Sequence, residues 1–300
     1  MKKILLLLVM IITMQYIYAC EICGGSSAGS YFGILPDYKT NFIAFKHRYR
    51  SFTSRHLTES SEPEMTSADR FHTAEIWGRI NLNKRLQLFA ILPLNFYSQK
   101  TDAGITNSNG IGDVSLQLSY ILINTSGDKK SVQQLLQLGA GIKLPTGAHK
   151  VVSNGEKLHQ NMQPGSGTFD FPISLIYTIR KKNIGLSTEA SYRINTFNKD
   201  NIAYGNKFTS SARSFYVVTK RSTSIIPHAG ISFEFAGKDF DGIEVNNYSG
   251  GKVINFVTGV DLHLKRFSLG FGWQQPIKSD LAQGRITPHA SFNSSINILF

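Results

Sequence analysis

One pattern recurs along this chain from about residue 41 to its last residue and limits what the chain can fold into. Segments of roughly ten residues alternate apolar and polar side chains, and a break separates each segment from the next. Val114, Leu116 and Leu118 share one face of such a segment, whereas Ser115 and Gln117 share the other. This dyad repeat is typical of a β-strand that has lipid on one face and a polar interior on the other. The pattern therefore predicts an all-β protein whose strands cross a membrane.

The number and spacing of the segments indicate the architecture. About twelve can be recognised, an even number as in single-chain bacterial barrels, with expected spans 41–53, 70–82, 86–97, 112–124, 131–145, 168–180, 183–195, 206–221, 224–235, 252–264, 266–275 and 287–300. Short connections such as 83–85 and 181–182 alternate with long ones such as 54–69, 98–111 and 146–167. Outer-membrane barrels have short periplasmic turns and long external loops. We therefore expect an antiparallel transmembrane β-barrel of about 12 strands over residues 41–300, with both termini in the periplasm.

The first residues are typical of an export signal. Lys2 and Lys3 precede an apolar run from Ile4 to Ile12, and a short polar stretch ends at the small residue Ala19. Cleavage after Ala19 would make residues 1–19 a signal peptide and residues 20–40 a periplasmic tail. The apolar run is shorter than the roughly 18 residues that a spanning helix needs. The expected location is the outer membrane of a Gram-negative bacterium, with outer-membrane lipid as a partner.

Both cysteines lie in the tail, in Cys20-Glu21-Ile22-Cys23. Cys20 directly follows the signal and resembles a lipid-attachment site, although Tyr18 stands where a small residue is usual. The pair could instead form a disulfide in the oxidising periplasm. It could also bind a soft metal such as copper or zinc, for which two thiolates do not complete a site. A tail without a role is the fourth alternative, and the C-x-x-C spacing does not choose among them.

The net charge of the chain needs a location. It is +12, and 12 − 2 = +10 once Lys2 and Lys3 leave with the signal. An exported protein is not expected to meet nucleic acid, so we expect no such partner. The alternation places many charged side chains on the lumen face instead. The lumen-lining candidates are Lys46, Arg48, Arg50, Glu75, Arg79, Asp113, Lys143, Glu189 and Arg193, and Asp170, Lys207, Arg213, Arg221, Glu234 and Asp261 fall on the same face.

Two interpretations of these lumen charges remain open. Opposite charges could pair across strands and brace the barrel. Alternatively, they could form a weakly cationic pore lining, for which Lys46, Arg48 and Arg50, spaced by two residues, are the best evidence.

Catalysis finds little support in the sequence. An enzymatic barrel needs a nucleophilic serine with a histidine partner near the membrane surface, and no two histidines form an H-x-x-x-H motif. His149 and His159 share one long loop, where solvated histidines are commoner than a metal site. We therefore expect neither an enzyme nor a cofactor.

The last ten residues resemble an assembly signal. Phe292, Ile296 and Ile298 alternate on one face, and the chain stops at Phe300. A terminal aromatic residue that closes an amphipathic strand resembles the feature that the barrel-assembly machinery recognises. We expect that machinery as a partner and Phe300 as part of the signal.

Three glycine-rich segments carry a family resemblance: Gly110-Ile111-Gly112-Asp113-Val114, the segment GAGIKLPTG from Gly139 to Gly147, and the segment QPGSGT from Gln163 to Thr168. Together they resemble the outer-membrane β-barrel family named for the meta-pathway of phenol degradation, over roughly residues 40 to 300. Members of this family are often labelled transporters. The resemblance implies uptake of small molecules, aromatic or otherwise apolar, and it supplies no catalytic residues.

Three functions follow as hypotheses. The first is a transporter or channel for a small-molecule substrate that the sequence does not identify. The second is a non-transporting barrel that binds a ligand, or a metal through Cys20 and Cys23. The third is a lipid-modifying enzyme of the outer membrane.

Overall fold

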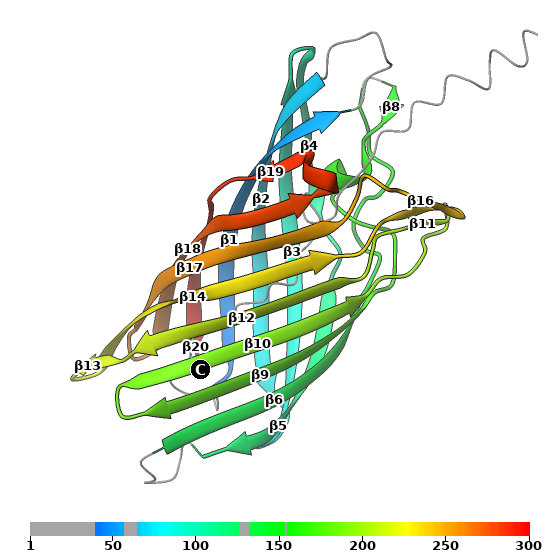
Figure 1. Ribbon diagram of the computed structural model, residues 1–300. Coiled ribbons are helices and arrows are strands. Elements are labelled where there is room, and N and C mark those ends of the chain that lie inside the picture. Colours follow the sequence, from blue (N-terminus) through cyan, green and yellow to red (C-terminus); the bar gives the residue numbers. More distant parts are fainter. Residues whose placement is uncertain (1–39, 57–64, 126–131, 154) are drawn as a thin grey trace, which may run out of the picture.

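The computed structural model describes residues 40–56, 65–125, 132–153 and 155–300. Twelve strands of this part form a closed antiparallel barrel (Figure 1). Each strand pairs with the next, and β1 and β20 close the seam. In order around the barrel they are β1 (Phe42–His56), β2 (Met65–Asn81), β3 (Leu86–Thr101), β5 (Ser115–Asn124), β6 (Val132–Lys143), β9 (Phe171–Lys181), β10 (Ile184–Ile194), β12 (Lys207–Tyr216), β14 (Thr223–Ala236), β17 (Gly251–His263), β18 (Phe267–Leu281) and β20 (Ser291–Leu299).

The remaining elements are short and belong to the connections. They are β4 (Gly104–Ile111), β7 (Val152–Ser153), β8 (Glu156–Lys157), the 3-10 turn η1 (Gln160–Met162), β11 (Ile202–Ala203), β13 (Val218–Lys220), β15 (Phe240–Asp241), β16 (Glu244–Val245), η2 (Ala282–Gly284) and β19 (Ile286–Pro288). Within the described ranges, no helix has the length and apolar character needed to cross a membrane.

The two ends of the barrel differ. At one end, here called the short-turn end, residues 82–85, 182–183 and 264–266 join neighbouring strands. Asn41 and Phe300 also meet at this end, where their backbones exchange two hydrogen bonds of 3.1 and 3.0 Å. The other, long-loop end holds the connections 144–170, 195–206 and 237–250. The alternation of short and long connections therefore sorts them onto opposite ends.

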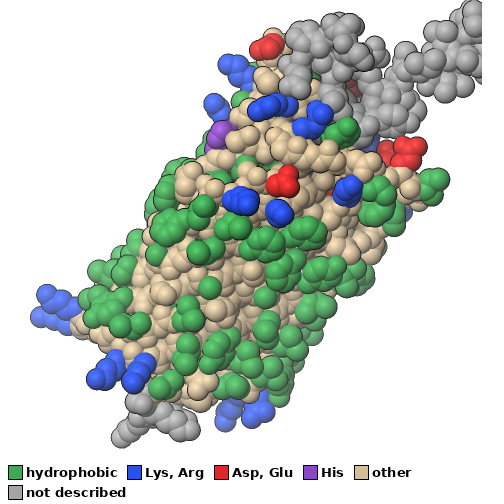
Figure 2. Space-filling view, viewed as in Figure 1, with side chains coloured by type: hydrophobic (Ala, Val, Ile, Leu, Met, Phe, Trp, Pro, Cys, Tyr) green, Lys and Arg blue, Asp and Glu red, His purple; other side chains and the backbone are tan. Residues whose placement is uncertain are grey.

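The wall of the barrel has an apolar outer face. Ile43 and Phe45 of β1 are 54% and 50% exposed, whereas Phe42 and Ala44 are buried. Figure 2 shows hydrophobic side chains in a broad band over the visible wall, with Lys and Arg gathered toward the two ends. A barrel embedded in a bilayer has this distribution, because its outward side chains contact lipid.

The expected fold class is confirmed, but the strand ends differ from those expected. Residues 98–111, expected to be a loop, form a hairpin in which β3 runs on to Thr101 and β4 pairs back along it. Their polar side chains lack the apolar alternation of a lipid-facing strand, and a strand that extends beyond the bilayer does not need it.

The expected strand over 206–221 is confirmed apart from its end, but the placement of Arg221 on the lumen face is wrong. β13 continues β12 in the same register against β14, since Phe215 pairs with His228 and Val218 with Ile225. Arg221 lies in the turn between β13 and β14 with a left-handed φ of 54° and an exposed side chain. The apolar–polar alternation continues up to this turn, so it did not indicate where the strand ends.

Candidate functional site: the barrel interior

Ion pairs cross the barrel interior. Arg50 of β1 donates from Nη2 to Glu234 Oε2 of β14 at 3.2 Å. Because β20, β18 and β17 separate these two strands around the wall, the pair spans the interior rather than following the wall. Glu234 also lies 3.5 Å from Lys207 Nζ of β12. A single carboxylate thus pairs with one cation from across the barrel and one from the neighbouring strand.

Arg50, Glu234 and Lys207 belong to a set of interior charges that is here called the charged belt. Two further groups of charges complete the charged belt. Arg48 Nη2 lies 2.8 Å from Glu75 Oε1 on the neighbouring strand β2. Lys46 is 6% exposed and interacts electrostatically with Glu75, Glu189 and Arg213. The cationic row of β1 therefore faces carboxylates of β2, β10 and β14, which is the arrangement expected of internal bracing.

The other lumen-lining candidates lie away from this belt. Arg79 is buried near the short-turn end, where its Nη2 donates to Thr40 O at 2.6 Å and its guanidinium lies 5.0 Å from the ring centre of Phe42. Arg193 is buried near the long-loop end of β10. The structure thus places all nine candidates on the inner face but brings only some of them together. Their role in lining a path stays a prediction.

An apolar cluster fills the interior at the long-loop end. Phe52, Phe71 and Tyr97 come from three neighbouring strands and form edge-to-face pairs with ring centres 5.9 and 5.0 Å apart. Ala236, Val253, Leu281, Ala282 and Ile286 join the cluster from β14, β17, β18 and the segment that follows β18. These strands follow one another around the wall from β3 through β1 and β18 to β14, so the cluster lines a large part of the mouth of the barrel.

Met162 lies in this cluster and belongs to a loop. It ends η1 in the 144–170 connection and is only 1% exposed. Gln163, the next residue, orders the loop from within: its side chain bonds the backbone of Val151 (2.9 and 3.1 Å) and Leu158 O (2.8 Å). The loop therefore turns inward and closes over the apolar mouth.

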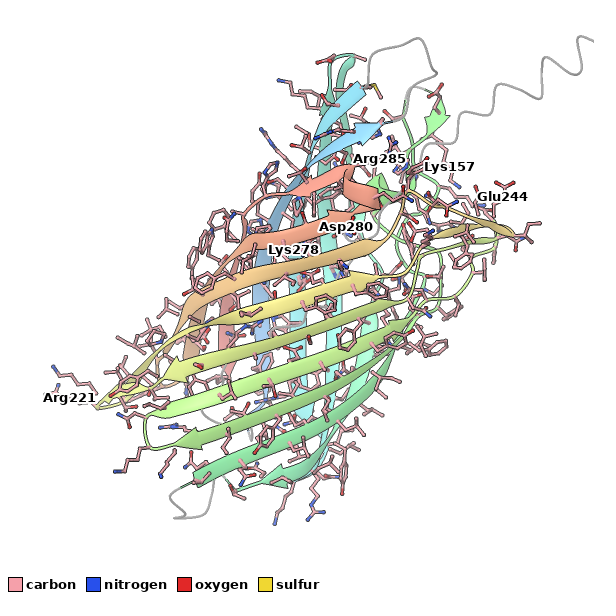
Figure 3. All side chains as sticks on the ribbon, in the orientation of Figure 1. Lys157, Arg221, Glu244, Lys278, Asp280 and Arg285 are labelled. Carbon is pink, nitrogen blue, oxygen red and sulfur yellow. The ribbon has the colours of Figure 1, made fainter. Side chains whose placement is uncertain are left out.

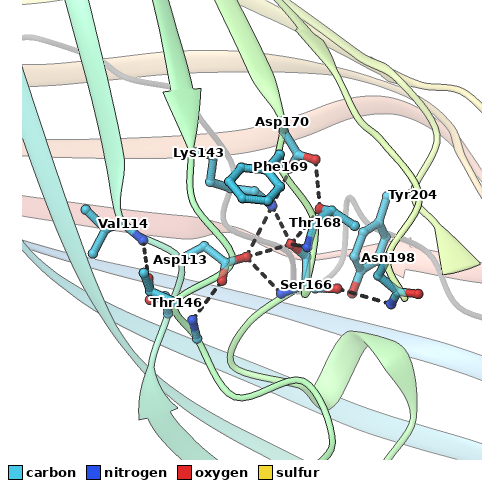
Figure 4. Close-up of polar contacts among 12 residues, drawn as sticks. Asp113, Val114, Lys143, Thr146, Ser166, Thr168, Phe169, Asp170, Asn198 and Tyr204 are labelled. Carbon is cyan, nitrogen blue, oxygen red and sulfur yellow. Dashed lines mark hydrogen bonds and ion pairs between the residues drawn. The ribbon is translucent and has the colours of Figure 1, made fainter. Parts of the chain in front are cut away.

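A buried ionic cluster anchors both ends of this loop (Figure 4). Lys143 Nζ lies between two carboxylates, in contact with Asp170 and 3.3 Å from Asp113 Oδ2, and also donates to Ser166 Oγ at 2.7 Å. Asp113 in turn accepts from the backbone N–H of Gly147 (2.9 Å) and of Ser166 (2.8 Å). The charged side chains are at most 4% exposed. Such a buried cluster stabilises the loop only while every charge keeps its partner.

Glycines allow the two ends of the loop to meet. A Cβ added to Gly165 would lie 2.5 Å from backbone atoms of Gly147, which is too close for any side chain. Asn95 of β3 secures the same point by donating from Nδ2 to Pro164 O at 2.8 Å. The three glycine-rich segments recognised in the sequence therefore pack against one another where the inward loop begins and ends.

A second apolar group faces the interior at the short-turn end. Phe42, Ala44, Trp77 and Phe89 form a buried cluster, and the rings of Phe42 and Trp77 meet edge-to-face at 4.7 Å. Phe215, Val217 and Ile226 form another buried group. Buried polar groups share this end, since Arg79 lies beside Phe42 and Gln137 Nε2 donates to Gln87 Oε1 at 2.7 Å. The interior therefore has an apolar cluster toward each end, with the Arg50–Glu234 ion pair between the two clusters.

Salt links tie the inward loop to its neighbour. Asp200 of the 195–206 connection accepts hydrogen bonds from Lys150 Nζ at 2.8 Å and from Lys157 Nζ at 3.4 Å. The Lys150 hydrogen bond holds the pKa of the Asp200 carboxyl below its usual value. These residues are largely exposed, so the links add little beside the buried anchor.

The apolar–polar alternation predicted the inward-facing charges but not the apolar clusters or the inward path of the loop. Phe52 continues the spacing of Lys46, Arg48 and Arg50, so the same alternation could have placed it inside. Met162 carried no such signal, because only the tertiary path of the loop brings it into the barrel.

No group of three or more potential metal ligands occurs among the residues that the structure describes. Cys20, Cys23 and the proposed signal peptide lie outside the described residues. The lipidation, disulfide and metal hypotheses for the tail therefore stay predictions.

Comparison with known proteins decides the family. The model for the family described as the MetA-pathway of phenol degradation matches residues 66–280, more than two thirds of the chain. The chain belongs to this family. The resemblance carried by the three glycine-rich segments is thereby confirmed. No curated protein matches the chain by sequence.

Solved structures agree with the fold. An outer membrane channel from Pseudomonas putida F1 superposes with a TM-score of 0.61 at 13% identity, covering 91% of this chain and 99% of that one. The β-domain of the Bordetella autotransporter BrkA gives a TM-score of 0.50 at 11% identity, covering 86% of this chain and 99% of that one. At these identities the likeness establishes an outer-membrane barrel fold and leaves the substrate open.

Proposed function

We propose that this family member is an outer-membrane channel for passive entry of small molecules, with a preference for aromatic or apolar compounds. The observation that carries the proposal is the order of surfaces inside the barrel. A solute that enters at the long-loop end would meet Phe52, Phe71, Tyr97 and Met162, then the charged belt, and then the group around Trp77.

Aromatic side chains inside the barrel favour apolar solutes for a physical reason. Porin lumens are polar and hold water, so dissolved polar solutes pass without losing their hydration. A constriction lined by rings and a thioether removes that water, which costs little for an aromatic solute and much for a polar one. Twelve strands also enclose a lumen between a filled eight-stranded barrel and a wide sixteen-stranded porin.

The orientation belongs to the same proposal. We place the long-loop end outside the cell and the short-turn end, with both termini, in the periplasm, because outer-membrane barrels have this arrangement. Cleavage after Ala19, insertion by the barrel-assembly machinery and contact with outer-membrane lipid accompany it. The proposal includes no catalytic step.

A non-transporting barrel is the second candidate, and one observation favours it. The Arg50–Glu234 pair and Met162 occupy the interior from opposite sides, which is the arrangement of a barrel that holds a ligand without passing it. A metal held by Cys20 and Cys23 would fit this candidate as well.

Solute entry into liposomes separates the two candidates. Phenylalanine and serine are both zwitterions that cross lipid slowly, but only phenylalanine has a ring. Liposomes that contain the barrel should admit phenylalanine faster than serine. Phe52→Ser with Phe71→Ser should lower the ratio of the two rates, even if a wider mouth raises both.

The matched control changes two rings on the lipid-facing wall. Phe45→Ser with Phe96→Ser removes side chains that are 50% and 51% exposed, and it should leave the ratio unchanged. If neither solute enters faster than in protein-free liposomes, the barrel does not transport. If the interior variant keeps the ratio, the channel has no aromatic preference.

A further inference from the structure

An aromatic row crosses the outer face of five neighbouring strands. Strand register aligns Phe96 of β3, His72 of β2, Tyr49 of β1, Phe292 of β20 and Trp273 of β18. The Tyr49 ring lies 4.7 Å from His72 and 6.4 Å from Phe292. Because the strands tilt by about 40°, residues in register differ in height by about 3 Å from one strand to the next. Aromatic side chains at such outward positions are typical of the zone where acyl chains give way to headgroups.

Cations follow this row toward the long-loop end. Arg70 of β2 lies two residues beyond His72, and Lys100 of β3 lies two residues beyond Ser98, the register partner of Arg70. Arg55 of β1 lies six residues beyond Tyr49. All three are exposed and lie on the outward face. With about 3.4 Å per residue and a strand tilt near 40°, Arg70 and Lys100 lie about 5 and 10 Å beyond the rings.

No carboxylate of these strands neutralises the three cations. β1, β2 and β3 contain Asp69 and Glu75 as their only acidic residues, and both face the interior. Asp69 accepts from Ser54 Oγ at 2.6 Å and Gln99 Nε2 at 3.0 Å. Within the described part of the chain, Arg55, Arg70 and Lys100 belong to none of the ion pairs.

The outer face of β17 and β18 provides a contrast at the same end of the barrel. Lys252 is the register partner of Asp280, and Lys278 lies two residues before it on the same strand. Figure 3 shows Lys278 and Asp280 on adjacent parts of β18. Lys252 therefore has a carboxylate beside it on the neighbouring strand, whereas Arg55 and Arg70 meet no outward-facing acidic residue on β1, β2 or β3. Lys100 precedes the exposed Asp102 by two residues.

We propose that Arg55, Arg70 and Lys100 form a binding site for the phosphate groups of the glycolipid in the outer leaflet. Its phosphates lie at the boundary that the aromatic row marks, and its acyl chains would contact the apolar wall below. Arg70 and Lys100 are diagonal neighbours on adjacent strands, about 7 to 8 Å apart at the backbone, so both side chains can reach one phosphate. Arginine binds such a group in bidentate fashion.

Titration of the purified barrel with lipid A tests the site. Native mass spectrometry in zwitterionic detergent would measure affinity for the bisphosphorylated form and for its monophosphoryl derivative. Arg55→Gln, Arg70→Gln and Lys100→Gln together should weaken binding of the bisphosphorylated form by tenfold or more, because three cations that attract its phosphates are removed. The wild-type barrel should also prefer the bisphosphorylated form, and the variant should lose that preference.

A matched control removes three exposed cations at the short-turn end: Lys181→Gln, Lys220→Gln and Lys265→Gln. This control should keep wild-type affinity. Equal weakening in both variants would mean that net charge alone attracts the lipid and would overturn the proposal. So would undiminished binding in the first variant, or a change confined to self-association of the barrel. All six residues are exposed, so heat-modifiable mobility on gels should confirm that both variants fold.

Discussion

Arg50 and Glu234 form an ion pair 3.2 Å long between strands that are not neighbours in the barrel wall. Their side chains are 16% and 13% exposed, so water screens the pair less than it screens a surface pair. Lys207 shares the same carboxylate. The Arg50–Glu234 pair therefore links two distant parts of the barrel wall through the interior. The charges that would select ions are largely the same charges that form this link.

Reversing the cations of β1 should change ion selectivity. In Arg48→Glu with Arg50→Glu, both residues would face Glu75 and Glu234 with like charge, so the belt becomes strongly acidic. Reversal potentials in a salt gradient should shift toward cation preference, and more so at low salt because screening is weaker. The variant should also lose its fold at a lower temperature, because each broken pair leaves a partly buried charge.

The opposite change provides the companion variant. Glu75→Gln with Glu234→Gln leaves the cations without their partners and should shift the reversal potential toward anion preference. Shifts of opposite sign in the two variants would show that the belt faces the ion path. If the barrel conducts but neither variant changes the reversal potential, the charged belt braces the barrel and does not select ions.

Surface labelling should distinguish the two ends of the barrel. Gly155 is exposed in the 144–170 connection, so an epitope inserted after it should be labelled on intact cells. An epitope at Lys84, in the turn between β2 and β3, should be labelled only after the outer membrane is breached. The reverse pattern would invert the orientation, since both expectations rest on the distribution of short and long connections.

Removing the last side chain should slow assembly more than it destabilises the folded barrel. Phe300 is 64% exposed and contributes mainly backbone hydrogen bonds to Asn41 at the seam. In Phe300→Asp, insertion measured by pulse-labelling should fall, while the melting temperature of the protein that does insert should change little. Phe267→Asp, on the adjacent strand opposite Ile298, controls for a polar group facing lipid. Equal insertion defects in both variants would deny Phe300 a role as a signal.

The sequence was sufficient for the barrel but not for the interior of its mouth. Strands are readable because lipid imposes an apolar residue at every second position, as at Ile43 and Phe45. The glycine-rich segments could be recognised as a family signature from the sequence. The reason for the glycines lies in the tertiary structure, because the backbones of Gly147 and Gly165 are in contact. Met162 sits in a segment without periodicity, and Lys143 pairs with residues 30 and 27 positions away in the chain. No local pattern encodes such contacts, since loop conformation depends on what the closed barrel brings together.

Breaking the anchor should open the mouth of the barrel. Lys143→Met leaves Asp113 and Asp170 buried without their cation, a change that typically costs about 3 to 5 kcal/mol. The ionic cluster joins the two ends of the loop, so we expect the loop to leave the mouth and take Met162 with it. Conductance should rise, and trypsin should then cleave at Lys150 or Lys157. Lys207→Met serves as the matched control, because it removes another buried lysine that pairs with Glu234 of β14 and not with Asp113 or Asp170. Adding Asp170→Asn to Lys143→Met should partly restore protection, because one uncompensated carboxylate is gone. If Lys143→Met keeps both wild-type conductance and resistance to trypsin, the ionic cluster does not hold the loop, and packing around Met162 alone keeps it inside.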